Sequence, residues 1–159
     1  MKRIPLTQNK YALVDDRDYE QLNQWKWRAQ KSINTWYASR RSSRKNGKPK
    51  TILMHRLILG LESGDPRETD HKDGSGLNNC RDNLRAATKA QNQHNRKRQK
   101  GTSKFKGVYW KKDRAKWRAY IKVERQSIHL GCFNSEMHAA RAYDHAAKIY
   151  FGEFACTNF

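Results

Sequence analysis

The chain has 159 residues, which is enough for one ordinary domain or two small ones. It contains 34 Lys and Arg against 15 Asp and Glu, a formal net charge of +19. Because so large a charge repels itself unless a polyanion is nearby, the composition favours nucleic acid as a partner. Five Trp, seven Tyr and five Phe supply large apolar groups to bury, which excludes an intrinsically disordered chain.

The sequence predicts an intracellular protein without membrane contact. Its longest apolar stretches, such as residues 52–54, are far shorter than the roughly 20 residues of a membrane span. Lys2 and Arg3 are followed by polar residues, so no apolar signal-peptide core is expected. The three cysteines are widely spaced and odd in number, which excludes a disulfide framework and a CxxC zinc site.

The N-terminal part of the chain is expected to form short elements. Three strands are predicted, at residues 11–14, 25–28 and 33–39. Residues 16–23 form a turn or a short helix between the first two strands. Residues 53–61 carry apolar side chains at the spacing of one helical face, so we expect a helix that ends at Gly60 or Gly64. The polar, basic run 39–50 contains the turn signal Asn46-Gly47 and predicts a basic hairpin loop.

A change in charge divides the chain. Residues 96–126 contain 13 basic and 2 acidic residues, and the run 96–104 has no apolar residue. A segment of this kind cannot contribute to a core, so we interpret residues 96–104 as a basic linker. The linker separates two expected domains, residues 1–95 and 105–159.

The C-terminal domain is predicted to be a three-stranded sheet followed by a helix. The strands are expected at residues 107–112, 116–123 and 126–131, and the helix at residues 135–151. Ser135 is the predicted N-cap and Gly152 the stop signal. In the middle strand apolar and polar side chains alternate, which indicates one buried face and one cationic, solvent-exposed face. The whole chain is therefore expected to be of the α+β class.

Polar side chains typical of metal and phosphate chemistry are concentrated between residues 69 and 95. Asp70 and His71 are expected at the end of a strand, followed by a loop and a second strand at residues 83–87. Thr88 and Gln91 have the spacing of a capping box, which predicts a helix from about residue 89. Such a strand, loop, strand and helix would place four side chains around one cleft: Asp70, His71, Asn83 and Asn92.

Residues 52–95 resemble the HNH endonucleases of the ββα-metal type, which are common among bacteriophage and homing enzymes. The resemblance rests on His55, the pair Asp70-His71, the run Asn83-Leu84-Arg85, and Asn92. It implies that Asp70 and Asn92 bind one divalent cation, that His71 is the general base, and that Asn83 orients His71. His94 in place of Asn92 is the alternative metal ligand, and His55 is interpreted as structural or substrate-proximal.

The residue types fit this chemistry on their own. Phosphodiester hydrolysis needs an activated water and a way to hold charge on the leaving oxygen. A neutral imidazole, with an ordinary pKa of about 6.5, provides the first, and a bound cation provides the second. Carboxylate and amide oxygens suit Mg²⁺ or Mn²⁺ better than zinc. For an isolated Asp-His pair, the simpler interpretation is a turn with a surface histidine.

Residues 105–159 resemble the plant ethylene-response-factor (ERF) DNA-binding domain. The resemblance rests on five runs: Lys106-Gly107-Val108-Tyr109, Lys116-Trp117-Arg118-Ala119, His129-Leu130-Gly131-Cys132-Phe133, Ala139-Ala140-Arg141-Ala142-Tyr143-Asp144 and Asn158-Phe159. It implies that the open face of the sheet enters the major groove of double-stranded DNA. The candidate DNA-binding residues are Lys106, Tyr109, Lys111, Arg118, Tyr120, Lys122 and His129. Plant domains usually carry arginines in the first strand, where this chain has Tyr109 and Lys111.

Together these features predict a metal-dependent endonuclease that nicks double-stranded DNA, a phage homing-type enzyme acting as a monomer or weak dimer. We expect it at DNA in the cytoplasm of a bacterial host cell. A non-catalytic DNA-binding or transcriptional regulator is the alternative from another class. A nuclease that acts on RNA is the third possibility, because positive charge alone does not distinguish the two polymers.

Overall fold

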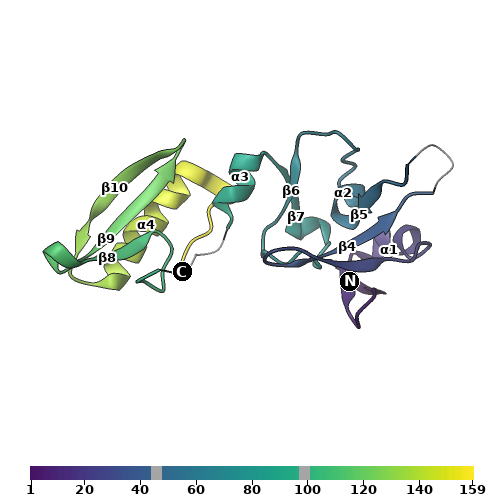
Figure 1. Cartoon of the computed structure of the whole chain (residues 1–159), viewed down its shortest axis with the longest axis horizontal. Coiled ribbons are helices and arrows are strands. Elements are labelled where there is room, and N and C mark those ends of the chain that lie inside the picture. The colour runs from purple at the N-terminus through teal and green to yellow at the C-terminus, as the bar shows by residue number, and fades with distance from the viewer. Residues whose placement is uncertain (44–47, 97–100) are drawn as a thin grey trace. The chain divides into compact units, whose positions relative to one another are not determined.

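The computed structural model describes residues 1–43, 48–96 and 101–159, which divide into two compact units, Met1–Asn92 and Gln93–Phe159 (Figure 1). Each unit contains helices and antiparallel strands around a hydrophobic core of its own. The predicted α+β class is confirmed. No helix in the described ranges is long and apolar enough to cross a membrane.

The first unit is built from short elements. In chain order they are β1 (Lys2–Pro5), β2 (Tyr11–Val14), α1 (Asp16–Leu22), β3 (Arg28–Lys31), β4 (Trp36–Arg41), β5 (Thr51–Leu53), α2 (Met54–Ile58), β6 (Glu68–His71), η2 (Arg81–Asn83), β7 (Leu84–Ala87) and α3 (Lys89–His94). The strands form three antiparallel sheets, β1-β2, β3-β4-β5 and β6-β7. One core joins them, with buried residues from β1, β2, β4, β7 and the helices α1 and α2. The edge of β2 also carries the loop before η2, because Leu13 donates to the Leu77 carbonyl and accepts from the Asn79 amide.

The predicted strand at residues 25–28 is wrong, because strand β3 begins only at Arg28. Trp25 and Trp27 suggested a strand, but they lie in a loop and pack there. Trp27 is buried and donates its indole N–H to the Leu22 carbonyl, and the Trp25 ring meets it edge-on. The Arg40 guanidinium lies 4.2 Å from the centre of the Trp25 ring, a cation–π contact. Strands β1 and β5 were also missed. Strand β1 has few apolar residues, and β5 has only three residues, the last of which was included in the predicted helix 53–61.

The basic run 39–50 is partly strand. Strand β4 extends to Arg41, and Ser39 inside it is completely buried. Ser42 and Lys50 then pair, because the Ser42 amide donates to the Lys50 carbonyl and the Lys50 amide to the Ser42 hydroxyl. The turn signal Asn46-Gly47 lies outside the described residues.

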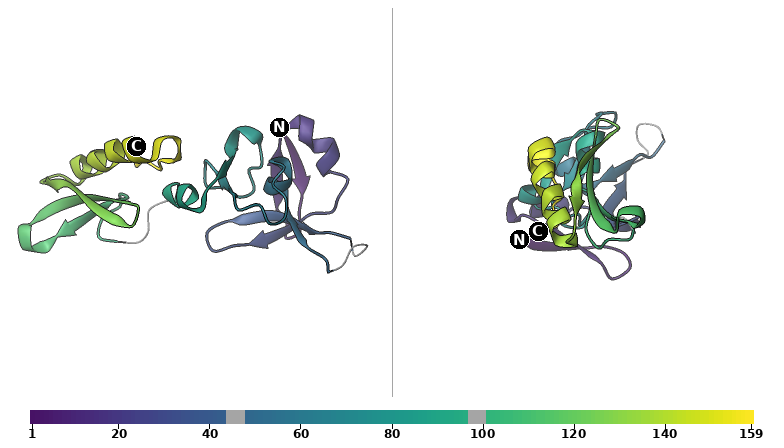
Figure 2. Two further views of the ribbon diagram at one scale, coloured as in Figure 1. Left: turned by 90° about the horizontal axis from the view of Figure 1, so that it is seen from above. Right: turned by 90° about the vertical axis from the view of Figure 1, so that its left-hand side faces the viewer.

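The second unit is a sheet covered on one face by a helix. Its elements are β8 (Val108–Lys111), η3 (Lys112–Arg114), β9 (Lys116–Val123), β10 (Gln126–Phe133), α4 (Glu136–Phe151) and η4 (Gly152–Phe154). The antiparallel strand order is β10-β9-β8, and Figure 2 shows α4 lying along one face of this sheet. Small buried residues of α4, such as Ala139, Ala140 and Ala147, allow the helix to lie close to the strands. All three strands and the helix agree with the prediction to within two residues.

The two ends of helix α4 differ from each other. Gly152 has a positive φ of 52°, so it ends the helix as predicted. Ser135 occupies the N-cap position, but its hydroxyl makes no capping hydrogen bond. A second glycine is required by packing: a Cβ added to Gly107, whose φ is +73°, would lie 1.9 Å from a ring carbon of Tyr143.

Strand β10 contains a β-bulge. His129 pairs with Tyr120, whereas Gly131 pairs with the next residue, Ala119, so Leu130 is extra. The bulge changes which side chains share a face. His129 and Cys132 lie beside the exposed residues of β9, while Phe133 packs on the core with Leu130.

The segment expected to be a linker contributes to the second unit. Residues 97–100 of it lie outside the described residues, but Ser103 is 2% exposed. Its hydroxyl donates to a carboxylate oxygen of Glu136 on α4, and the Thr102 hydroxyl accepts from the Trp110 amide. Short polar side chains here bond to the sheet and helix, which a search for apolar residues does not detect.

Candidate functional site

The candidate site of the first unit is built on strand β6, strand β7 and helix α3. The two strands pair so that Asp70 is opposite Arg85 and His71 is opposite Leu84. Helix α3 follows β7 through the predicted capping box, which the structure confirms. The Thr88 amide donates to Gln91 Oε1 at 2.8 Å, and the Gln91 amide donates to Thr88 Oγ1 at 3.2 Å.

His71 lies in a cluster of aromatic rings. Its ring is 5.1 Å from that of His55 and 5.9 Å from that of Tyr37, and the latter two rings are 5.0 Å apart. His71 and His55 are 6% and 5% exposed. Neighbouring strand residues point to opposite faces, so His71 faces this cluster and the buried Leu84. The histidine therefore sits in a largely apolar, enclosed environment.

Burial keeps both imidazoles neutral. Burial, together with the smaller effects of the nearby His71 and Arg56, lowers the pKa of His55 to about 3. Burial also lowers the pKa of His71, while a hydrogen bond with Asn79 and the carboxylates of Asp73 and Asp70 act in the opposite direction. A neutral His71 has an unprotonated ring nitrogen that can accept a proton at neutral pH.

The other face of β6 carries charged and amide side chains. Asp70 is 3% exposed and forms an ion pair of 2.6 Å with Arg85 on β7. Glu68, two residues earlier on the same strand, accepts a hydrogen bond from Asn92 Nδ2 of α3 at 2.5 Å. The fold thus places Asn92 of α3 against Glu68, two residues before Asp70 on β6.

The oxygen atoms on this face fit a hard divalent cation. Asp70 and Glu68 offer carboxylates, and Asn92 keeps its amide oxygen while its nitrogen donates to Glu68. In the described residues no group of three or more His, Cys, Asp or Glu side chains is placed to hold a metal. Mg²⁺ needs no such group, because it is usually bound through one or two carboxylates and keeps several waters.

The Asn83 side chain was expected to orient His71, but its hydrogen bonds in the structure go to other residues. Its Oδ1 accepts from the Asp73 amide at 3.0 Å, and its Nδ2 donates to Asp73 Oδ1 and to the Asn78 carbonyl at 2.8 Å. These bonds hold the loop that joins β6 to β7. The buried amide that interacts with His71 belongs to Asn79 instead, which is completely inaccessible to solvent.

His94 and Asn92 have different surroundings, although both lie on α3. The His94 ring stacks on Phe151 with 3.8 Å between ring centres, and its backbone carbonyl accepts a hydrogen bond from Lys106 Nζ. His94 and both of these partners belong to the second unit, Gln93–Phe159. Burial and the Lys106 charge lower the pKa of His94. The carboxylate of Glu68, in contrast, is the partner of Asn92.

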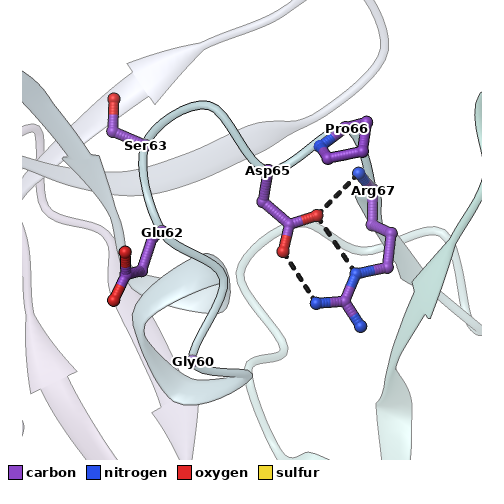
Figure 3. A pocket seen from close by; sticks show the side chains of 6 residues that line it. All are labelled: Gly60, Glu62, Ser63, Asp65, Pro66 and Arg67. Carbon is purple, nitrogen blue, oxygen red and sulfur yellow. Dashed lines mark hydrogen bonds and ion pairs between the residues drawn. The ribbon is translucent and has the colours of Figure 1, made fainter.

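A hollow of about 560 Å³ lies in the connection between α2 and β6 (Figure 3). Its lining consists of Gly60, Glu62, Ser63, Asp65, Pro66 and Arg67, none of which is a predicted site residue. Asp65 bonds to the side chain and backbone of Arg67, which lowers the pKa of Asp65 to about 2. Arg56 donates to three carbonyls of this connection, so the hollow belongs to a well-bonded loop.

In the second unit, six of the seven predicted DNA-binding residues share the face of the sheet opposite α4. They are Tyr109, Lys111, Arg118, Tyr120, Lys122 and His129. The ammonium of Lys111 is 3.3 Å from a carboxylate oxygen of Asp113. Lys106 differs from the prediction, because it lies outside the strands and its ammonium binds the His94 carbonyl.

Three residues of the first site were not predicted. Glu68 could have been found from the period of two along a strand, since it shares a face with Asp70. No sequence signal marks Tyr37 or Asn79, because each meets His71 only through the folding of distant segments. Two arginines of η2 and β7 have acidic partners: Arg85 pairs with Asp70 and Arg81 with Asp18.

Comparison with known proteins gives two kinds of relative. An uncharacterized HNH endonuclease of Acanthamoeba polyphaga mimivirus is 33% identical over 111 residues, which cover 67% of this chain and 57% of that protein. An ethylene-responsive transcription factor-like protein of Arabidopsis thaliana is 49% identical over 61 residues, 37% of this chain and 26% of that protein. Protein 3.8 of Escherichia phage T7 is 45% identical over 56 residues, 35% of this chain and 46% of that protein.

No protein-family model matches the chain. The ERF-type similarity covers about 60 residues at the C-terminus. The chain spans 57% or less of the length of each of these three relatives. The chain is therefore a distant homologue of an HNH endonuclease over two thirds of its own length, with an ERF-like C-terminal region.

Proposed function

We propose that this chain is a metal-dependent HNH endonuclease that hydrolyses phosphodiester bonds of double-stranded DNA, as a phage homing-type nicking enzyme. The observation that carries the proposal is the β6-β7-α3 arrangement, which holds a neutral His71 next to Asp70 and brings Asn92 to the same strand. The distant HNH relative supports it. The expected domains, residues 1–95 and 105–159, would then divide cutting from DNA binding.

In this mechanism His71 accepts a proton from the attacking water at its unprotonated ring nitrogen. The water oxygen then bonds to phosphorus, and the bond between phosphorus and the leaving oxygen breaks. Asp70 and Asn92 would hold Mg²⁺ or Mn²⁺, which supplies stabilisation of negative charge on the phosphate and the leaving oxygen. Asn83 acts on the loop between the strands, and Asn79 helps to hold the imidazole.

The ERF-like unit would anchor the nuclease unit on DNA. Both are part of one chain, so DNA bound by the sheet experiences a high effective concentration of the His71 site. Lys122 and other cations on the open face would contact phosphates, so DNA affinity should fall steeply with salt. A nuclease unit tethered in this way need not bind DNA tightly itself.

A second candidate function is supported by the burial of the site. Asp70 and His71 are 3% and 6% exposed, and Asp70 is already paired with Arg85. A nuclease fold with a closed centre could serve only to bind DNA, as in a non-catalytic regulator. The two functions differ in whether the chain cuts DNA when a divalent metal is present.

Cleavage of supercoiled plasmid tests the proposal directly. The purified chain is incubated with Mg²⁺ or Mn²⁺, or with EDTA, and nicked and linear products are separated on a gel. We expect metal-dependent nicking that falls by about 10²- to 10⁴-fold in His71→Ala, the usual contribution of a general base. His138→Ala is the matched control, since His138 is exposed on α4 and should cut at the normal rate.

Binding must be measured alongside cleavage. His71→Ala should retain the DNA affinity of the unaltered chain, which shows that the loss is chemical. Salt-sensitive DNA binding without cutting in any metal would support the regulator instead. If the chain cleaves structured RNA in preference to duplex DNA, RNA takes the place of DNA as the proposed substrate.

A further inference from the structure

Arg118 differs from the other cations of the open sheet face because the protein fixes its side chain. It lies in the central strand β9, opposite Tyr109 on β8 and Cys132 on β10. Its Nε donates to His129 Nδ1 at 2.9 Å, and its Nη1 donates to the Tyr109 hydroxyl at 3.0 Å. Lys122, four residues further along β9 on the same face, is exposed and has no hydrogen bond or ion pair to any residue of the described ranges that would fix its ammonium.

The partners of Arg118 are themselves held in place. The rings of Tyr109 and Tyr120 meet edge-on, with 5.5 Å between centres. His129 Nε2 lies 3.9 Å from Cys132 Sγ, a residue brought to this face by the bulge. In this arrangement His129 Nδ1 is the acceptor of the Arg118 Nε–H.

The two hydrogen bonds determine which part of the guanidinium is left for a ligand. A guanidinium has five N–H groups, and these bonds use the Nε–H and one N–H of Nη1. One N–H of Nη1 and both of Nη2 have no partner among the described residues. They form the end of the planar fork, which can donate to two adjacent acceptor atoms at once.

We propose that Arg118 is a base-reading residue that donates both end nitrogens to the N7 and O6 acceptors of a single guanine in duplex DNA. Guanine presents these two acceptors side by side in the major groove. In this arrangement Tyr109 and His129 are positioning residues that fix the guanidinium plane. The inference rests on the proposed DNA binding by this unit and adds what the sheet recognises.

A phosphate is the less suitable ligand for this group. Phosphate contacts tolerate flexible cations, and Lys122 and Lys116 supply exposed ones on β9. A guanidinium held by two hydrogen bonds loses little side-chain entropy on binding and presents a fixed orientation. A fixed orientation helps a side chain to discriminate between base pairs. A contact to a phosphate needs no such discrimination, because every nucleotide carries the same phosphate.

The test uses the full-length chain in EDTA, so that binding is measured without cleavage. Bound molecules are selected from a pool of DNA duplexes with a randomised segment, and the selected duplexes are sequenced. We expect a guanine preference of about tenfold or more at one position, since a bidentate contact is worth about 1–3 kcal/mol. Arg118→Lys should abolish the preference at that position while binding strength on unselected DNA changes little, because the charge remains.

Two further variants test the positioning role. Tyr109→Phe removes one acceptor, and His129→Ala removes the other; each should weaken the same guanine preference by a few fold. His129→Asn should restore it, because the asparagine Oδ1 takes the place of Nδ1 as an acceptor. Arg141→Lys, on the exposed side of α4, is the control and should leave the preference unchanged.

The outcomes separate this inference from the proposed function. DNA binding with no guanine preference, or a preference that persists in Arg118→Lys, would overturn the base-reading role and leave the DNA-binding proposal intact. A smaller dependence of affinity on salt in Arg118→Ala, without a change in guanine preference, would show a phosphate contact. Absence of DNA binding in the unaltered chain would overturn both proposals.

Discussion

The two units of this protein use polar side chains in opposite ways. In the first unit the candidate residues are enclosed: His71 faces Tyr37 and His55, and Asp70 is paired with Arg85. In the second unit the candidates line a sheet face without a covering helix, and Tyr120 is 38% exposed. Enclosure shifts pKa values, which acid–base chemistry needs. Exposure leaves donors accessible, which recognition of a large polyanion needs.

The contrast between the units predicts that a destabilising substitution in one unit leaves the stability and activity of the other unchanged. The largest effect is expected for Arg85→Met, which leaves the buried Asp70 without its guanidinium partner. Breaking a buried ion pair in this way typically costs about 3–5 kcal/mol. In EDTA, hydrogen exchange should show the loss in the amides of β6 and β7, while plasmid binding by the second unit persists.

The same variant tests the metal site. Mn²⁺ at Asp70 would replace the missing positive charge, so adding it should slow exchange in β6 and β7. Ala86 is the matched control position, since Ala86→Met changes an exposed site on the same strand. If Mn²⁺ has no effect on Arg85→Met, the assignment of Asp70 as a metal ligand is contradicted.

Gly107→Ala is expected to affect the second unit and to leave the first unchanged. A Cβ at Gly107 would collide with the Tyr143 ring, and φ is +73°, a conformation that L side chains rarely adopt. Steric overlap and backbone strain together should destabilise the second unit by about 2–4 kcal/mol. Urea unfolding should show an early transition with loss of DNA binding, and exchange in β6 and β7 should be unchanged.

Gly101→Ala provides the control for that experiment, because a Cβ at Gly101 meets nothing within 4 Å. Equal destabilisation by the two substitutions would mean that the close approach of Gly107 to Tyr143 does not contribute to the free energy of unfolding. Loss of protection in both units together would show that they do not behave as separate folding units.

A smaller effect is expected from pH, and His55 of the first unit should contribute to it. The pKa of His55 is about 3 in the folded state and near its ordinary 6.5 when unfolded. Between these values the unfolded chain binds a proton that the folded chain does not, so stability falls as pH falls. The contribution of His55 to the slope has an upper limit of about 1.4 kcal/mol per pH unit. Unfolding measured between pH 7 and pH 4 should show a decrease in stability, and His55→Phe should make that decrease smaller.

The smallest effect is expected at the hollow of Figure 3. Asp65→Asn removes the charge that pairs with Arg67 on an exposed loop. Exposed ion pairs contribute little to stability, so thermal unfolding, cleavage and DNA binding should not change measurably. A marked loss of cleavage in this variant would mean that the α2–β6 connection takes part in substrate binding, contrary to the division between the units.

Sequence analysis predicted the second unit more accurately than the first. In strand β9 the alternation of buried Ala119 and Ile121 with exposed neighbours is a local signal, and Gly152 marks the helix end. In the first unit the signals were misleading, because Trp25 and Trp27 favour a strand but pack as a loop around Leu22. Their positions depend on the whole core.

The candidate site was predictable in composition but not in contacts. The capping box and the Asp70-His71 pair are local, and the structure places them on the expected elements. The partner of each side chain depends on segments far apart in sequence. Arg85 lies against Asp70 because β6 and β7 pair, and Tyr37 reaches His71 from β4. Spacing along the chain contains no information on either contact.

The bulge at Leu130 has a consequence for how this protein can evolve. It places His129 and Phe133 on opposite faces of β10, although they are four residues apart and would otherwise share one. If the sheet reads DNA as proposed, substitutions at positions 109, 118 and 129 change the recognised DNA sequence while leaving the buried face intact. Inserting or deleting a single residue between His129 and Phe133 would instead exchange the faces, exposing the aromatic ring and burying the imidazole. Changes in specificity should thus accumulate in this strand as substitutions, with the strand length kept constant.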